Sequence, residues 1–279
     1  MDAEAYLAER TPLVDHLLEA WLPPADAPPA SLHTAMRHLI FPGGKRLRPA
    51  LAFAAAEAVG APPERAAPIA AAVELVHTWS LVHDDLPCMD DDALRRGRPT
   101  VHKVFGEAVA VLAGDVLLAA AFEGLAQETG HEPVRVVAAL RDLAHAAGSR
   151  QLAGGQADDL VFPCDGATVE AVESVHRRKT AALFAAAVVG GARLGGADGA
   201  ALERLRRFAD GVGIAFQIAD DWLDRDADES CSLVRLVGPE AARARAEELL
   251  QDAGMALEPF GARAAALREL ARFAVWRDR

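Results

Sequence analysis

Prolines and glycines divide this chain of 279 residues into segments of helical length. Alanine, leucine, arginine and glutamate dominate the segments, whereas aromatic residues make up only 5% of the chain. Alanine and the unbranched side chains lose little conformational freedom in a helix, so this composition favours helix nearly everywhere. We therefore expect an all-α protein, a bundle of about ten or more helices.

The same residues predict where individual helices begin and end. Prolines at positions 23–29 close a first helix, Phe41-Pro42-Gly43-Gly44 closes a second, and Pro49 marks the first turn of a third. An apolar stretch from about Ile69 to His83 predicts a helix buried on most sides. Further helices are expected at 105–128, 132–149, 168–193, 199–224, 239–254 and 260–276. No break in composition and no internal repeat appears, so residues 1–279 are predicted to form one domain.

The charge of the chain argues against a nucleic-acid partner. Its formal net charge is -12, whereas binding to phosphate backbones needs an excess of lysine and arginine. A small anionic substrate is still compatible with this charge, because a local group of basic residues is enough to bind it.

The cysteines and the apolar segments bear on where the protein works. Cys88, Cys164 and Cys231 lie far apart in the chain, a spacing that fits neither disulfides nor zinc and favours a reducing cytoplasm. Residues 1–10 lack the organisation of a signal peptide. The longest apolar run, Ala181 to Val189, is shorter than the roughly 20 residues that cross a bilayer, so no transmembrane segment is predicted.

An aspartate cluster follows the apolar helix that ends near His83. Five aspartates fall within nine positions: Asp84, Asp85, Asp90, Asp91 and Asp92. Like charges at this density repel one another unless a cation lies among them. Pro87 should break the helix here, so a helical wheel does not place Asp90 relative to Asp84.

A second cluster contains Asp220, Asp221 and Asp224. Asp220 and Asp224 are four residues apart, which puts them about 5–6 Å from each other on one helix face. Ligands that are all oxygen favour Mg²⁺ over zinc or copper. Either cluster alone could equally be a solvated acidic helix end. Two clusters in apolar segments favour metal binding, because unpaired carboxylates are costly there.

Two basic segments could bind phosphate groups that share such a metal. Lys45, Arg46 and Arg48 lie within Gly43–Pro49, and Arg95, Arg96 and Arg98 follow the first aspartate cluster. The planar guanidinium suits bidentate phosphate contacts. The alternative is that these loops only balance the nearby aspartates. Two single residues are also open to either interpretation: His77 could be a ligand or a core histidine, and Lys179 could bind substrate or extend to solvent.

Taken in order along the chain, these motifs resemble the trans-isoprenyl diphosphate synthases, which include farnesyl and geranylgeranyl diphosphate synthases. The resemblance covers about residues 35 to 224. It rests on Gly43 to Pro49, Asp84-Asp85 with Asp90, Arg95-Arg96-Gly97, Gly154-Gly155-Gln156, Lys179-Thr180, and Phe216-Gln217 with Asp220-Asp221-Asp224. Residues 99–115 look especially like geranylgeranyl diphosphate synthases.

The resemblance implies a helical bundle around a deep cavity, usually a homodimer, that condenses an allylic diphosphate with isopentenyl diphosphate. It implies that isopentenyl diphosphate is held by Lys45, Arg48, His77 and Arg96, and the allylic substrate by Arg95, Lys179, Thr180 and Gln217. It assigns three Mg²⁺ ions chiefly to Asp84, Asp90 and Asp220, with Asp85, Asp221 and Asp224 close by.

The chain departs from the family pattern after Asp224. The loop there is shortened and lacks two lysines that family members carry. Either allylic diphosphate binding is weaker here, or Arg225 or Arg235 replaces the lysines. A bulky residue five positions before the first aspartate shortens the product in this family, and that position is Trp79. A terpene cyclase is disfavoured because both aspartate motifs and the Gly43–Pro49 loop are present. A non-catalytic partner subunit of another prenyl synthase is the remaining alternative.

Overall fold

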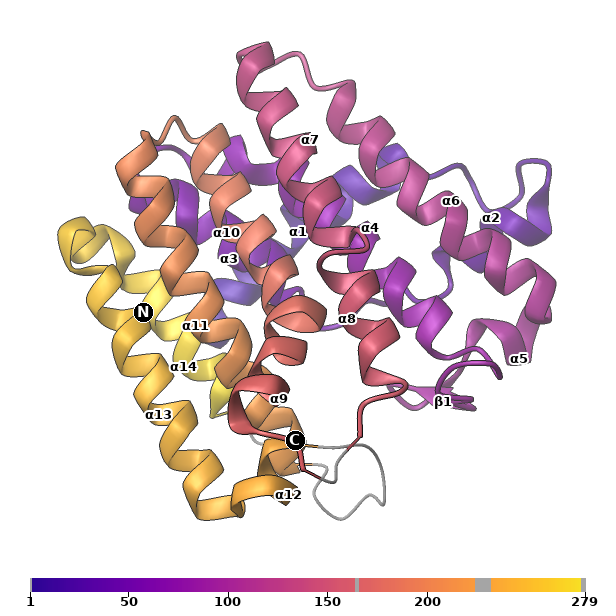
Figure 1. Ribbon diagram of the computed structural model, residues 1–279. Helices are drawn as coiled ribbons and strands as arrows, with labels where there is room; N and C mark the ends of the chain where they lie inside the picture. Colours follow the sequence, from indigo (N-terminus) through magenta and orange to yellow (C-terminus); the bar gives the residue numbers. More distant parts are fainter. Residues whose placement is uncertain (1, 164–165, 224–231, 277–279) are drawn as a thin grey trace.

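The computed structural model describes residues 2–163, 166–223 and 232–276, which form fourteen α-helices with short helical turns between some of them (Figure 1). The α-helices are α1 (Ala3–Trp21), α2 (Ala30–Arg37), α3 (Leu47–Ala58), α4 (Ala67–Asp84), α5 (Val101–Phe105), α6 (Glu107–Ala126), α7 (Pro133–Ala147), α8 (Leu152–Asp159), α9 (Val169–His176), α10 (Ala182–Leu194), α11 (Gly199–Leu223), α12 (Leu233–Val237), α13 (Pro239–Ala256) and α14 (Ala265–Val275). The turns are η1 (Pro63–Ala66), η2 (Arg177–Ala181) and η3 (Glu258–Ala264), and one hairpin joins β1 (Leu94–Arg95) to β2 (Arg98–Pro99).

Helices α3, α4 and α10 form the centre of the bundle and are buried along most of their length. Close approach of α10 to α3 depends on a glycine, because a Cβ at Gly191 would lie 2.1 Å from the backbone oxygen of Ala52. Helix α11 runs beside α10 (Figure 1), and a Cβ at Gly213 would lie 2.4 Å from Ala181. Helix α4 packs against both α3 and α10, so the same core positions the ends of α4 and α11, where the two aspartate clusters lie.

The all-helical prediction is confirmed, and most predicted helices are found within a few residues of their expected ends. The helix expected at 105–128 is found as α6, and Gly106, with a φ of 83°, separates it from the short α5, which was not predicted. The helix expected at 168–193 is interrupted by η2, a π-helical turn. Helix α8, the hairpin and the five-residue α12 were not predicted.

Among the described residues, helix α6 is long and apolar enough to cross a membrane by length and composition alone, a test that a core helix also passes. Helix α6 has 20 residues and a mean hydropathy of 1.9, and 39% of the apolar window is buried in the protein. The search for uninterrupted apolar runs missed it because Glu107, Asp115 and Glu123 divide it. Helix α6 packs against α4 and α2, and part of its apolar surface remains exposed.

Candidate active site

The first aspartate cluster forms a tight turn at the end of α4. The helix ends at Asp84, as Pro87 predicts, and the backbone N–H of Asp90 donates to the Asp84 carbonyl at 2.9 Å. The N–H of Asp91 donates to the Leu86 carbonyl at 3.1 Å. These two bonds return the chain toward the helix end, so that Asp90 lies beside Asp84 although six positions separate them.

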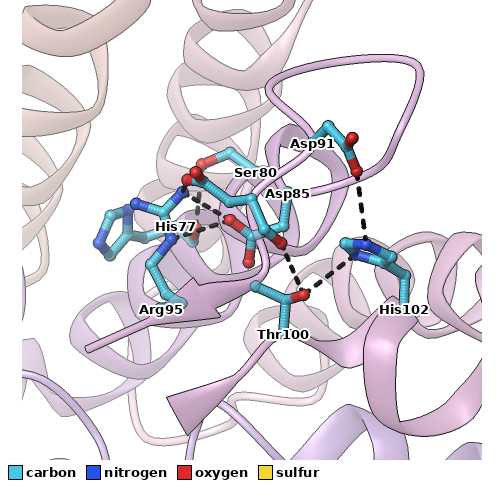
Figure 2. A network of polar contacts seen from close by, with 8 residues as sticks. His77, Ser80, Asp85, Asp91, Arg95, Thr100 and His102 are labelled. Carbon is cyan, nitrogen blue, oxygen red and sulfur yellow. Dashed lines mark hydrogen bonds and ion pairs between the residues drawn. The ribbon is translucent and has the colours of Figure 1, made fainter. Parts of the chain in front are cut away.

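Arg95 binds the cluster from the hairpin (Figure 2). Its Nε donates to Asp85 Oδ1 at 2.9 Å, and its Nη2 donates to Asp85 Oδ1 at 2.5 Å and to Asp92 Oδ2 at 2.6 Å. Asp85 is fully buried, and this burial raises the pKa of its carboxyl group although Arg95 lowers it. Arg95, expected at the allylic substrate, is therefore held by two carboxylates in this structure.

Lys179 links the first aspartate cluster to the rest of the site. Its Nζ donates to Asp159 Oδ2 at 2.6 Å, and the nearby carboxylates of Asp159, Asp84 and Asp90 raise its pKa against the effect of burial. Burial raises the pKa of Asp84 to about 7, while the positive charge of Lys179 lowers it. Lys179 thus lies among carboxylates from α4, the following turn and α8.

The π-helical turn η2 places Lys179 and Thr180 at this point, and a glycine lets α8 approach it. A Cβ at Gly155 would lie 2.5 Å from the backbone nitrogen of Lys179. Without a side chain at Gly155, α8 can bring Asp159 to the lysine. The Gly154-Gly155-Gln156 motif therefore has a packing role in addition to any contact with substrate.

Thr180 begins a polar chain that reaches the second aspartate cluster. Its Oγ1 donates to Gln217 Oε1 at 2.7 Å, and Gln217 Nε2 donates to Asp221 Oδ1 at 3.1 Å. The other carboxylate oxygen, Asp221 Oδ2, lies 3.4 Å from His176 Nε2. Burial raises the pKa of Asp221 to about 6 and lowers that of His176 to about 4. The structure thus brings Thr180, Gln217 and Asp221 together, as the resemblance implies.

The remaining second-cluster residues are Asp220, on α11 beside Asp221, and Asp224, which lies outside the described residues. The shortened loop with Arg225 lies outside them too, whereas Arg235 is on α12.

The donor set fits Mg²⁺ that shares its ligands with a substrate. Every candidate ligand is a carboxylate, and both Asp85 Oδ2 and Asp221 Oδ2 are buried without a hydrogen-bond partner. Among the described residues, no group of three or more Asp, Glu, His or Cys side chains is close enough to hold a metal by itself. Mg²⁺ typically takes one or two carboxylates and completes its shell with water and phosphate oxygens.

A cleft of ≈ 360 Å³ lies next to this site and gathers the other predicted basic residues. It is lined by Gly44, Lys45, Arg46, Leu47, Arg48, Glu74, His77, Arg96, Phe216, Phe273 and Ala274. The Arg48 guanidinium lies 4.8 Å from the Phe184 ring centroid, and its Nη1 is 3.3 Å from His77 Nε2. Burial and the charge of Arg48 lower the pKa of His77 well below its usual value, which keeps the imidazole neutral.

Two arginines of this cleft have opposite surroundings. Arg46 is buried, and its guanidinium donates to Glu74 Oε1 at 2.7 Å and to Asp15 Oδ1 at 3.0 Å. Arg96 forms no ion pair within the described part of the chain, and burial lowers its pKa. A Cβ at Gly44 would lie 2.5 Å from Arg96 Cζ, so the absence of a side chain at this glycine leaves room for the guanidinium. Arg46 therefore anchors the Gly43–Pro49 loop to Glu74 and Asp15, whereas Arg96 can bind an anion.

Sequence reasoning missed Asp159 and His176 as members of the site. Asp159 follows Gly154-Gly155-Gln156 by three residues, and His176 precedes Lys179 by three. Their positions beside known motifs are the only signal that the sequence offered. Arg98 was counted as a phosphate ligand, but it donates to the carbonyl oxygens of His38 and Phe41 and holds the hairpin in place.

The comparisons with known proteins agree with this geometry. Residues 29–232 match the family model described as polyprenyl synthetase. The chain belongs to the polyprenyl synthetase family. Within this family, it is 45% identical to the chloroplastic geranylgeranyl pyrophosphate synthase of Capsicum annuum, over 90% of this chain and 72% of that protein. It is 43% identical to the farnesyl diphosphate synthase of Bacillus subtilis, over 81% of this chain and 76% of that protein.

Solved structures of the family superpose closely on this polyprenyl synthetase. An FPP/GFPP synthase from Zymomonas mobilis gives a TM-score of 0.91 at 38% identity, covering 98% of this chain and 99% of that one. The geranylgeranyl pyrophosphate synthetase of Pyrococcus horikoshii gives 0.88 at 31% identity, covering 99% and 98%. The protein is a short-chain prenyltransferase with the all-helical fold that its sequence predicts.

Proposed function

We propose that this prenyltransferase condenses dimethylallyl, geranyl or farnesyl diphosphate with isopentenyl diphosphate and releases farnesyl or geranylgeranyl diphosphate. One observation carries the proposal: two pairs of consecutive residues connect the acidic site to the basic cleft. Arg95 binds the aspartate turn while Arg96 lines the cleft, and Gln217 contacts Asp221 while Phe216 lines the cleft. An allylic diphosphate in the acidic site therefore lies next to a second diphosphate in the cleft.

The chain's own residues bind and orient both substrates in this reaction. Lys179 and Thr180 contact the allylic diphosphate, and Lys45, Arg48 and Arg96 bind isopentenyl diphosphate. Three Mg²⁺ ions, held by Asp84, Asp90 and Asp220 with the help of their neighbours, would neutralise the charge on the departing diphosphate. Binding both substrates side by side makes the encounter effectively unimolecular.

The covalent change breaks the allylic C–O bond and forms one C–C bond. The double bond of isopentenyl diphosphate attacks the allylic carbon, and a proton leaves the adjacent carbon to restore a double bond. The released diphosphate is the base that accepts this proton, so no protein side chain is needed for the step. Phe184 and Phe216, whose ring centroids are 5.1 Å apart, form an apolar wall that excludes water beside Arg48.

The direct test incubates the purified protein with Mg²⁺, isopentenyl diphosphate and each allylic diphosphate in turn, and identifies the dephosphorylated products by chromatography. We expect chain extension to 15 or 20 carbons. A protein that extends no primer on its own, but changes the product of another prenyl synthase when mixed with it, would be a partner subunit instead.

We also propose that two copies assemble through α6. Val111 is 41% exposed and Leu112 is 53% exposed, and Ala108 and Ala119 are exposed on the same helix. By helical spacing these residues share one face of α6, the helix at the right of Figure 1, and form an apolar stripe that the exposed Asp115 interrupts. Such a stripe is typical of a surface that a second protein covers. A relative in Arabidopsis thaliana is named the large subunit of a heterodimeric geranylgeranyl pyrophosphate synthase.

A further inference from the structure

A buried histidine with no role in the reaction described above packs under the aspartate turn. His102 is on α5, and its side chain is only 3% exposed. Its Nδ1 lies 3.1 Å from Thr100 Oγ1, and its Nε2 lies 4.0 Å from Asp91 Oδ1 (Figure 2). Among the described residues, Nε2 has no hydrogen-bond partner. A histidine this buried is costly unless it serves packing or a polar network.

The direction of each hydrogen bond in this network follows from the hydroxyl of Thr100. Its single hydrogen is donated to the carbonyl oxygen of Asp92 at 2.8 Å. The contact with His102 must therefore run from Nδ1–H to the threonine oxygen. Thr100 is fully buried, so water cannot replace either bond. The result is a two-bond chain from His102 through Thr100 to the backbone of the aspartate turn.

The bond from Thr100 adds to the contacts that the aspartate turn makes for itself. Asp91 has a φ of 50°, in the left-handed region, which aspartate adopts more readily than most side chains other than glycine. Lys103 Nζ lies 3.6 Å from the Asp91 carboxylate and adds a weak surface ion pair. The backbone bonds from Asp90 to Asp84 and from Asp91 to Leu86 form the turn. The buried bond from Thr100 to the Asp92 carbonyl fixes its far side.

We propose that His102 is a positioning residue that, through Thr100, holds the aspartate turn so that the Asp90 carboxylate faces Asp84. This rests on the proposed function only in assigning a divalent cation to Asp90. Partners that orient metal ligands usually change metal affinity about 10- to 100-fold when they are removed. Loss of His102 should thus weaken cation binding and leave the isopentenyl diphosphate cleft unchanged.

The test measures Mn²⁺ binding by electron paramagnetic resonance in the presence of inorganic diphosphate. His102→Leu should weaken Mn²⁺ binding about 10-fold. His102→Asn, whose amide nitrogen can take the place of Nδ1, should stay within about 3-fold of wild type. Thr100→Val keeps the shape of the side chain, removes the hydroxyl and should also weaken binding. Thr100→Val therefore tests the proposed role of the His102–Thr100 chain even if His102→Leu does not fold.

His131 provides a matched control. Its side chain is 5% exposed, its Nε2 is bonded to the Arg65 carbonyl at 2.9 Å, and its Nδ1 is unpartnered and 3.8 Å from Glu128. His131→Leu should lower the melting temperature without changing Mn²⁺ binding. Unchanged Mn²⁺ binding in Thr100→Val and His102→Leu, or equal weakening in His131→Leu, would overturn the proposal. Intact Mn²⁺ binding in a wild-type protein that extends no primer would refute the proposed function alone.

Discussion

Asp84 is the residue at which function and stability should separate most clearly. Burial raises its pKa to about 7, so its charged form is unfavourable in the fold until a cation neutralises it. We expect Asp84→Ala to lower kcat by at least about 100-fold while the melting temperature without Mg²⁺ stays equal or rises. Product formation and thermal denaturation are the two measurements. Asp252→Ala removes an exposed aspartate on α13 and should change neither. Turnover that survives Asp84→Ala would refute the metal role.

Trp79 should set the length of the product. It lies five residues before Asp84 on α4, about 7.5 Å further from the helix end, and is edge-to-face with His83 at 6.0 Å between ring centroids. We expect Trp79→Ala to lengthen the product by at least one isoprene unit, because a bulky side chain is removed from the helix that carries Asp84. Chromatography of the dephosphorylated products measures this. Trp21→Ala, on α1, is the control and should leave the product unchanged. An unchanged product from Trp79→Ala would mean that another residue limits the chain length.

Tyr6 allows a pH prediction with a direct optical readout, because it is the only tyrosine in the chain. It is buried and its hydroxyl donates to Glu57 Oε2 at 2.9 Å; burial and the charge of Glu57 raise its pKa far above the usual value of about 10. Its stabilising contribution is therefore complete below about pH 10 and is lost as the pH rises above that value, because the unfolded chain then releases a proton that the folded chain keeps.

The ultraviolet absorbance of tyrosinate should consequently appear only when the protein unfolds in base. Urea denaturation should show stability falling above about pH 10 in wild type and falling less steeply in Tyr6→Phe. Tyrosinate absorbance that rises near its usual pKa in the folded protein would contradict the burial and the hydrogen bond.

At the level of elements, replacing glycine by alanine should have opposite effects on stability in α10, which contacts α3, and in α13. Gly191→Ala would place a Cβ 2.1 Å from the Ala52 oxygen and should destabilise the protein by about 1–3 kcal/mol. Gly254 lies in α13, where an added Cβ would meet no atom within 4 Å, so Gly254→Ala should stabilise by up to about 1 kcal/mol. Urea denaturation of both variants measures the difference. Equal effects would mean that α10 and α3 are not in close contact.

Helix positions could be predicted from the sequence because proline and glycine act locally, as Pro49 and Pro87 do. The hairpin was not predictable, since two-residue strands have no periodicity and Leu94–Pro99 has the composition of a basic loop. The different roles of Arg46 and Arg96 were not predictable either. They depend on which carboxylates the fold brings near, and Glu74 lies 28 positions away from Arg46 in the chain.

At the scale of the whole molecule, the apolar stripe on α6 predicts a dimer that one charge can break. We expect wild type to have about twice the monomer mass of 29.5 kDa in solution, and Leu112→Glu to be a monomer because a buried unpaired charge is costly. Light scattering after size-exclusion chromatography measures the mass. Met255→Glu is the control, since Met255 is 52% exposed, close to the 53% of Leu112, and lies on α13 away from α6. A wild-type monomer would remove α6 as an assembly surface.

The π-helical turn between α9 and α10 affects how this chain can be recombined with its relatives. A π-helical bond joins residues five apart instead of four, so the turn holds one residue more than an α-helix would. That residue rotates everything after Ala181 by about 100° relative to His176. A chimera that takes α9 from a relative without this turn would therefore change the helical rotation that brings Lys179 to Asp159 and Thr180 to Gln217. The exchange has to include residues 169–181 as one unit.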